Sequence, residues 1–305
     1  MADLLTSGSG LNLYEVNTTG TDPKNGTALA AFNYFPNTTN SMVRDNSEFA
    51  IRYVDATTSN IRARYVQNRM INKDWVFAIP DDIRYSGTED TAIAGYGNQC
   101  HESCQEANFM VFRNENDGQT HVGYPYTEEW GFSTFPSEAI GADNGTAYAI
   151  VPILQLSTDE YPYVAMYLSA ESKLKEVYFA QEREQKWQLS NMNVNLTIDA
   201  GSQIAAMSYL LDDLRYVQVL VTHEDGGVMM AYLDGGPDKH WAETTSVSGM
   251  EDVIPLSPIA ANQAGRVYAL ENVNGTPEIV EWKRNSTTGT PMFERLGPVT
   301  PTPTT

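Results

Sequence analysis

The chain has few positive charges, few histidines and no long apolar run. Its 305 residues include 19 Lys and Arg against 39 Asp and Glu, a net charge of -20, and only four His. Binding to a phosphate backbone depends on clustered cations, so this balance argues against nucleic acid as a partner and against an anionic membrane surface. No apolar run approaches the roughly 18 residues that a membrane-spanning helix needs, so we expect no membrane insertion.

The short motifs that identify common enzymes are also missing. There is no Gly-x-Ser-x-Gly elbow, no His-Glu-x-x-His zinc motif, no phosphate-binding loop and no dinucleotide fingerprint. We therefore predict no catalytic residues, no cofactor and no metal ion. A polysaccharide lyase or glycoside hydrolase remains an alternative, because the 17 tyrosines allow a Tyr, His or carboxylate to converge with an Arg.

The chain contains two cysteines, Cys100 and Cys104, four residues apart. This spacing is not the Cys-x-x-Cys of redox proteins, and with His101 and Glu102 it gives a poor zinc ligand set. Seven N-x-[ST] sequons favour a secreted glycoprotein, in which the two cysteines would form a small-loop disulfide. The sequon asparagines are Asn17, Asn25, Asn37, Asn144, Asn195, Asn274 and Asn285.

A repeat of about 55 residues runs through the sequence. Four of the five tryptophans are spaced by 55, 57 and 54 residues, and Phe293 takes the same place 52 residues after the last of them. Each of the four begins a short strand-like piece. They are Trp75, Trp130, Trp187 and Trp241.

Each repeat also contains a hairpin signal, in which strand-like runs rich in Val, Ile and Tyr flank a short polar turn. Runs of small and aliphatic residues precede these hairpins with the same period, as in a crowded inner strand. The turns are Thr58-Ser59-Asn60, Asn116-Asp117-Gly118, Glu171-Ser172-Lys173, Asp225-Gly226-Gly227 and Asn274-Gly275.

Four short antiparallel strands per repeat predict an all-β fold, a β-propeller of four-stranded blades. We expect a single domain over residues 1–305, with five blade repeats over 27–298 and an extended Pro/Thr tail over 299–305. Residues 1–26 contain a strand candidate, Leu11–Val16, that would close the ring. Five blades is the favoured count, and six, with a partial blade at the N-terminus, is the alternative.

Two stretches resemble the fungal fucose-specific lectins of the Aleuria aurantia lectin type. The first joins Ala50-Ile51-Arg52-Tyr53 and Asn60-Ile61-Arg62 to Trp75. The second runs from Ile259-Ala260-Ala261-Asn262 through Arg266-Val267-Tyr268 and Ile279-Val280-Glu281-Trp282 to Leu296-Gly297-Pro298-Val299. The resemblance implies a fungal propeller that holds L-fucose between adjacent blades, where an Arg and a Glu bind the hydroxyls and an aromatic ring covers the apolar sugar face.

Carried onto this sequence, the resemblance selects six candidate ligand-binding residues. The last repeat keeps both charges, as Arg266 and Glu278, which are twelve residues apart. The full set is Arg52, Trp75, Glu176, Trp187, Arg266 and Glu278.

The sequence therefore predicts a carbohydrate-binding protein without catalysis, recognising fucose or a related glycan. Two alternatives stay open: a secreted carbohydrate-active enzyme, and a secreted effector that binds a host protein with its rim. Many unrelated functions share such scaffolds, so the fold alone does not decide among them.

Overall fold

The computed structural model consists of β-strands, and no helix occurs among the residues it describes. No helix in that part of the chain has the length and apolarity to cross a membrane. The described residues are 2–7, 10–15, 28–34, 48–67, 76–77, 92–97, 108–113, 119–126, 129–134, 142–153, 163–180, 186–211, 214–233, 240–285 and 290–299.

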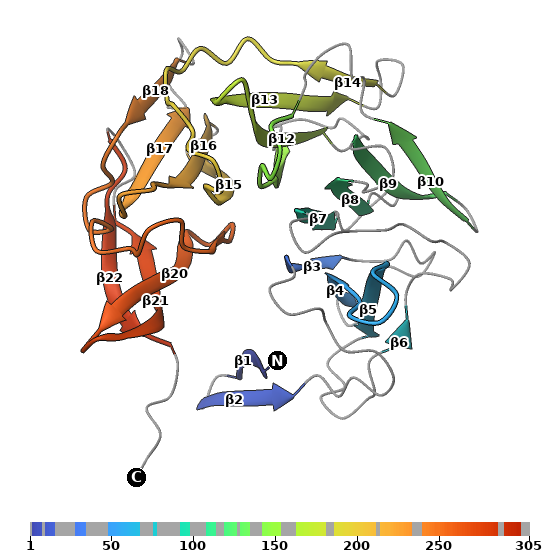
Figure 1. Ribbon diagram of the computed structural model, residues 1–305, viewed down its shortest axis with the longest axis horizontal. Helices are drawn as coiled ribbons and strands as arrows, with labels where there is room; N and C mark the ends of the chain where they lie inside the picture. Colours follow the sequence, from blue (N-terminus) through green and yellow to red (C-terminus); the bar gives the residue numbers. More distant parts are fainter. Residues whose placement is uncertain are drawn as a thin grey trace.

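Five four-stranded antiparallel sheets follow one another along the chain and around a ring (Figure 1). The sequence prediction of a β-propeller with four-stranded blades is thus confirmed. The first blade contains β3 (Ala30–Tyr34), β4 (Glu48–Val54), β5 (Ile61–Gln67) and β6 (Val76–Phe77), and the second β7 (Ile93–Gly97), β8 (Asn108–Arg113), β9 (Thr120–Tyr126) and β10 (Glu129–Thr134). The third contains β11 (Ala149–Ile153), β12 (Tyr163–Ala170), β13 (Lys173–Ala180) and β14 (Lys186–Leu189), and the fourth β15 (Ile204–Leu211), β16 (Leu214–Thr222), β17 (Val228–Leu233) and β18 (Trp241–Thr244). The last blade contains β19 (Ile259–Ala261), β20 (Arg266–Val273), β21 (Thr276–Arg284) and β22 (Phe293–Pro298).

The innermost strands of neighbouring blades contact each other, β3 with β7, β7 with β11, β11 with β15 and β15 with β19. The small and aliphatic runs of the sequence lie at or beside these strands, where the sheets converge. The second strand of each blade defines two ends of that blade. We call the end at which this strand begins the front end, and the end at which it finishes the back end.

A two-stranded sheet of β1 (Ala2–Ser7) and β2 (Gly10–Glu15) lies between the last blade and the first (Figure 1). The sequence analysis expected one strand over Leu11–Val16 here, and the structure has a hairpin. This sheet occupies the place of a sixth blade, with two strands instead of four. That it closes the ring in solution stays a prediction.

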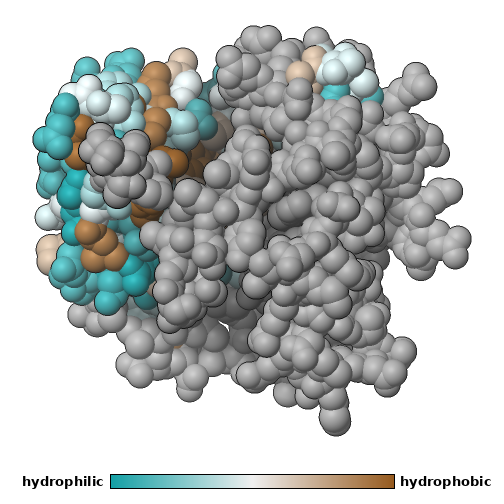
Figure 2. Space-filling model, turned by 90° about the horizontal axis from the view of Figure 1, so that it is seen from below, coloured by the Kyte–Doolittle hydropathy of each residue, from teal (hydrophilic) through white to brown (hydrophobic). Residues whose placement is uncertain are grey.

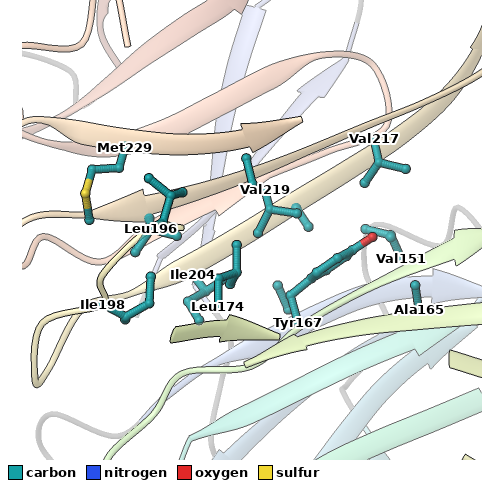
Figure 3. Packing of buried hydrophobic residues seen from close by; sticks show 14 of the residues in the cluster. Val151, Ala165, Tyr167, Leu174, Leu196, Ile198, Ile204, Val217, Val219 and Met229 are labelled. Atoms are coloured by element: carbon teal, nitrogen blue, oxygen red, sulfur yellow. The ribbon is translucent and has the colours of Figure 1, made fainter. Parts of the chain in front are cut away.

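Aliphatic side chains fill most of the seam between the third and fourth blades. Figure 3 shows Tyr167 of β12 among side chains of both blades, near Val151 of its own blade and Val217 and Val219 of β16. The seam between the fourth and last blades has a similar core around Trp282, whose Nε1 donates to the carbonyl of Gly249 at 2.7 Å. These packed seams hold the blades in a fixed order.

The hairpin of the last blade is regular from end to end. β20 and β21 pair without interruption, and they are joined by Asn274 and Gly275, whose φ angles are 53° and 85°. A two-residue turn with both φ angles positive fits the right-handed twist of the strands and explains the Asn-Gly sequence. The regular register fixes which side chains share a face.

Candidate functional site

The last blade carries charged residues on both faces of its sheet, and the register shows which of them belong together. Tyr268 lies directly opposite Glu281, and Glu271 lies opposite Glu278. Side chains alternate along a strand, so Arg266, Tyr268 and Glu281 share one face. Glu278 lies on the other. The pair that the sequence analysis selected, Arg266 and Glu278, is therefore not brought together.

Arg266, Tyr268 and Glu281 form what we call the last-blade cluster. Arg266 Nη1 lies 3.1 Å from Glu281 Oε1, and Tyr268 Oη donates to the same oxygen at 3.1 Å. The side chains of Arg266 and Glu281 are 33% and 24% exposed. Both contacts use one carboxylate oxygen, so within the described chain Oε2 and most guanidinium N–H groups are available to a ligand.

The environment of the cluster keeps Tyr268 protonated. Partial burial, the hydrogen bond to Glu281 and the negative charge of Glu281 raise the pKa of the Tyr268 hydroxyl, while Arg266 lowers it. The hydroxyl is thus a stable donor to the carboxylate at neutral pH. The three groups present a positive donor, a negative acceptor and an aromatic ring within one patch.

The last-blade cluster lies on the side of its sheet that faces away from the fourth blade. The opposite face, with Val267, Ala269, Val280 and Trp282, packs against the fourth blade. Figure 2 views the molecule from the side of β1 and β2. There the described surface of the last blade, at the left, is largely hydrophilic with apolar patches between.

A second group of the same residue types lies between the third and fourth blades, and we call it the seam cluster. Tyr167 of β12 lies directly opposite Glu176 of β13, and its Oη donates to Glu176 Oε2 at 2.5 Å. Tyr167 has no exposed surface and Glu176 has 7%. Trp241 of the fourth blade meets the Tyr167 ring edge-on, with 6.1 Å between ring centroids.

Arg215 of β16 completes the seam cluster from the fourth blade. It shares its sheet face with Val217 and Val219, which pack against the third blade. Its Nε and Nη2 atoms are buried and have no hydrogen-bond partner among the described residues. Burial and the charge of Glu176 raise the pKa of Tyr167 well above its usual value, and the charge of Arg215 lowers it. The cluster thus joins a Tyr and a Glu from one blade to an Arg and a Trp from the next.

The two Tyr–Glu pairs occupy equivalent positions in their blades. In both, a Tyr of the second strand lies opposite a Glu of the third, on the face turned toward the next position around the ring. Arg266 stands two residues before Tyr268, and Ala165 stands two residues before Tyr167. In the fourth blade the corresponding cross-strand pair is Leu220 and Met230.

The structure accounts for the six predicted ligand-binding residues as follows. Glu176 and Arg266 lie in the two clusters, and Glu278 lies on the opposite face of the last blade. Arg52 and Trp187 belong to β4 and β14, but their side chains lie outside the described part of the structure, as does the whole of Trp75.

Sequence analysis missed Glu281 because it assumed a spacing of twelve residues between Arg and Glu. The two-residue turn places residue 283 opposite Arg266, so the glutamate on the same face is fifteen residues away. One feature of the sequence could have indicated Glu281. Tyr268, two residues after Arg266, lies on the same face as Arg266, and the residue directly opposite it in a hairpin with a two-residue turn is Glu281. The other missed residues are Tyr167, Arg215, Trp241 and Tyr268.

The remaining sequence predictions concern cysteines and sequons. Cys100, Cys104, Asn17, Asn25 and Asn37 lie outside the described residues. The other four sequon asparagines are exposed. Asn144, Asn195 and Asn274 lie at the back end of their blades, while Asn285 lies at the front end.

No protein-family model matches the chain, and no curated protein matches it in sequence. Solved structures match its fold along most of its length. The fucose-specific lectin from Aleuria aurantia is 16% identical with a TM-score of 0.65, covering 91% of this chain and 80% of that one.

Two further solved structures show the same likeness. AofleA from Arthrobotrys oligospora is 11% identical with a TM-score of 0.65, covering 95% of this chain and 77% of that one. SapL1 lectin, solved with alpha methyl fucoside, is 14% identical with a TM-score of 0.61, covering 90% and 80%. At these identities the likeness establishes a shared β-propeller fold.

Proposed function

We propose that this protein is a non-catalytic, lectin-like β-propeller that binds a saccharide at the last-blade cluster. The supporting observation is the accessible group of Arg266, Glu281 and Tyr268 on one sheet face. A guanidinium and a carboxylate can bind neighbouring hydroxyls as donor and acceptor with charge-assisted hydrogen bonds. An aromatic ring beside them can cover the apolar face of a sugar.

The likeness in fold to fucose-binding lectins guides the choice of ligand. We propose fucose or a related glycan, and membership of the Aleuria aurantia lectin type as a divergent relative. We also propose that the protein is a secreted fungal glycoprotein with a Cys100–Cys104 disulfide. Three of the four described sequon asparagines lie at the back end, while Asn285 follows β21 at the front end of the last blade, so only a glycan on Asn285 would lie at the same end as Arg266.

The proposal is tested by two substitutions that remove the same charge from the same strand. Glu281→Gln removes the carboxylate of the cluster, and Glu278→Gln removes one on the opposite face. On a glycan array followed by calorimetry, we expect Glu281→Gln to weaken saccharide binding by about 10-fold or more, because a charge-assisted hydrogen bond contributes roughly 1.5–3 kcal/mol. Glu278→Gln should bind like the wild type.

Four other outcomes would contradict the proposal. Equal weakening by both substitutions would place the ligand elsewhere. No binding of any saccharide at high protein concentration would remove the lectin function. Release of reducing ends or unsaturated sugars from polysaccharides would favour the enzyme alternative, and a pull-down partner that sugars do not displace would favour the effector alternative.

A further inference from the structure

Two of the four described sequon asparagines have side chains that are free to carry a glycan. The side-chain oxygens of Asn144 and Asn195 accept hydrogen bonds from an arginine and a lysine, at 2.5 and 3.0 Å. Asn274 and Asn285 are exposed, and within the described part of the chain no hydrogen bond involves their side chains. A glycan attached to either of these two asparagines would therefore break no contact with a described residue.

Asn274 and Asn285 lie at opposite ends of the last blade. Asn274 belongs to the turn between β20 and β21 at the back end, while Asn285 follows β21 at the front end. β21 pairs with β22 as far as Arg284 and Phe293, and the backbone N–H of Asn285 donates to the carbonyl of Met292 at 2.8 Å. Asn285 thus continues the strand by one residue, and the sheet fixes its position.

The strand places Asn285 on the face of the last-blade cluster. Side chains alternate along a strand, so Asn285 shares a face with Lys283 and Glu281. At a rise of about 3.3 Å per residue, Asn285 lies about 13 Å from Glu281 along the strand and about 7 Å from the cross-strand row of Lys283 and Arg266. Asn274, by the same rise, lies about 23 Å from Glu281. The Asn285 sequon is therefore much closer to the cluster.

We infer that a glycan on Asn285 covers the front end of the last-blade site and limits the length of the saccharide that the site admits. This inference rests on the proposed function. An N-linked glycan is bulky and lies in solvent, so on Asn285 it would occupy the space over the row of Arg266. A polysaccharide bound at Tyr268 and Glu281 extends past the cluster and meets this glycan. A monosaccharide covers the cluster alone and does not reach Asn285.

The test pairs two substitutions that each delete one glycan from the last blade and leave its asparagine in place. Thr287→Ala removes the sequon of Asn285, and Thr276→Ala, at an exposed position, removes the sequon of Asn274. Both variants and the wild type are produced as full chains in a yeast, which attaches N-linked glycans. Mass spectrometry of the glycopeptides measures the occupancy of each asparagine. Each protein is studied before and after enzymatic removal of its glycans.

Calorimetric titration then compares a short ligand, α-methyl-L-fucoside, with a long one that carries the same sugar, fucosylated xyloglucan. We expect glycosylated Thr287→Ala to bind the polysaccharide at least about 10-fold more tightly than the glycosylated wild type, and the fucoside within about 2-fold. Thr276→Ala should bind both ligands like the wild type. After the glycans are removed, all three proteins should bind the polysaccharide alike. Asn285→Gln should reproduce the result of Thr287→Ala.

The outcomes separate this inference from the proposed function. Equal polysaccharide binding by the glycosylated wild type and Thr287→Ala, or an Asn285 that carries no glycan, would overturn the inference and leave the lectin proposal intact. An equal gain in Thr276→Ala would do the same, because the effect would then not depend on the end of the blade. Absence of saccharide binding by every form, including the deglycosylated proteins, would overturn both.

Discussion

The seam cluster and the last-blade cluster contain the same cross-strand Tyr–Glu pair in two different surroundings. In the third blade the next blade covers the pair, and Tyr167 and Glu176 are buried. Among the described residues no four-stranded sheet follows the last blade, and the side chain of Glu281 is 24% exposed. The residues adjust to this difference: Ala165 stands where the last blade has Arg266, and the cation of the seam, Arg215, comes from the neighbouring blade.

Whether the next blade covers the Tyr–Glu pair decides if the pair serves as a structural contact or can bind a ligand. A buried carboxylate with a tyrosine hydroxyl and a nearby guanidinium contributes to holding two blades together. The same groups at a partly open face can exchange their contacts for those of a ligand. In the fourth blade, Leu220 and Met230 take the place of the Tyr–Glu pair, and the seam that they face is apolar.

The largest expected effect is the difference in stability between Glu176→Ala and Glu281→Ala. Removing Glu176 leaves the buried Tyr167 hydroxyl without its hydrogen-bond partner and a cavity in the seam, so we expect the free energy of unfolding to fall by about 3 kcal/mol. Removing the partly exposed Glu281 should cost less than about 1 kcal/mol. Urea denaturation followed by tryptophan fluorescence measures both. Similar losses would show that the two pairs are equally structural.

The next largest effect is expected at high pH, where the stability contributions of the two clusters should differ. Burial raises the pKa of Tyr167 far more than that of Tyr268, so Tyr167 holds its proton in the folded state after the unfolded chain has lost it. The contribution of the protonated Tyr167 to the free energy of unfolding is fully present below about pH 10. Above that pH it is lost by about 1.4 kcal/mol per pH unit. Urea midpoints between pH 8 and 11.5 should fall with a shallower slope in Tyr167→Phe. An unchanged slope would contradict this assignment.

Sequence predicted the propeller well because its signals are local and repeated. The Asn274-Gly275 turn, the alternating strands and the periodic tryptophans each act over a few residues, and each is repeated around the ring. Glu281 was missed because the register of two strands decides which side chains share a face: the assumed spacing of twelve residues is even, while this register requires an odd spacing, so the assumed spacing selects the opposite face. Arg215 was missed because it reaches its cluster across a seam, and no spacing along the chain encodes that contact.

A smaller effect is expected when the seam pair is replaced by the residues of the fourth blade. In Tyr167→Leu/Glu176→Met no buried hydroxyl or carboxylate is left unpaired, and the half-buried Arg215 can turn toward solvent. We expect this double variant to lose about 1–2 kcal/mol, less than Glu176→Ala alone, because apolar replacements of buried polar pairs are often tolerated. A loss equal to the sum of the single substitutions would show that the pair does not act as a unit.

The smallest effect on stability is expected from Tyr268→Phe, and it sharpens the comparison most directly. The substitution keeps the ring and removes one hydrogen bond to Glu281 at a partly exposed face, so the free energy of unfolding should change by less than about 0.5 kcal/mol. Tyr167→Phe removes the matching bond inside the seam and should cost about 1–2 kcal/mol. If Tyr268 positions the Glu281 carboxylate for a ligand, saccharide affinity should nevertheless fall about 3-fold in Tyr268→Phe and stay unchanged in Tyr167→Phe. Calorimetric titration of both variants measures this, and the opposite ranking of affinities would assign binding to the seam.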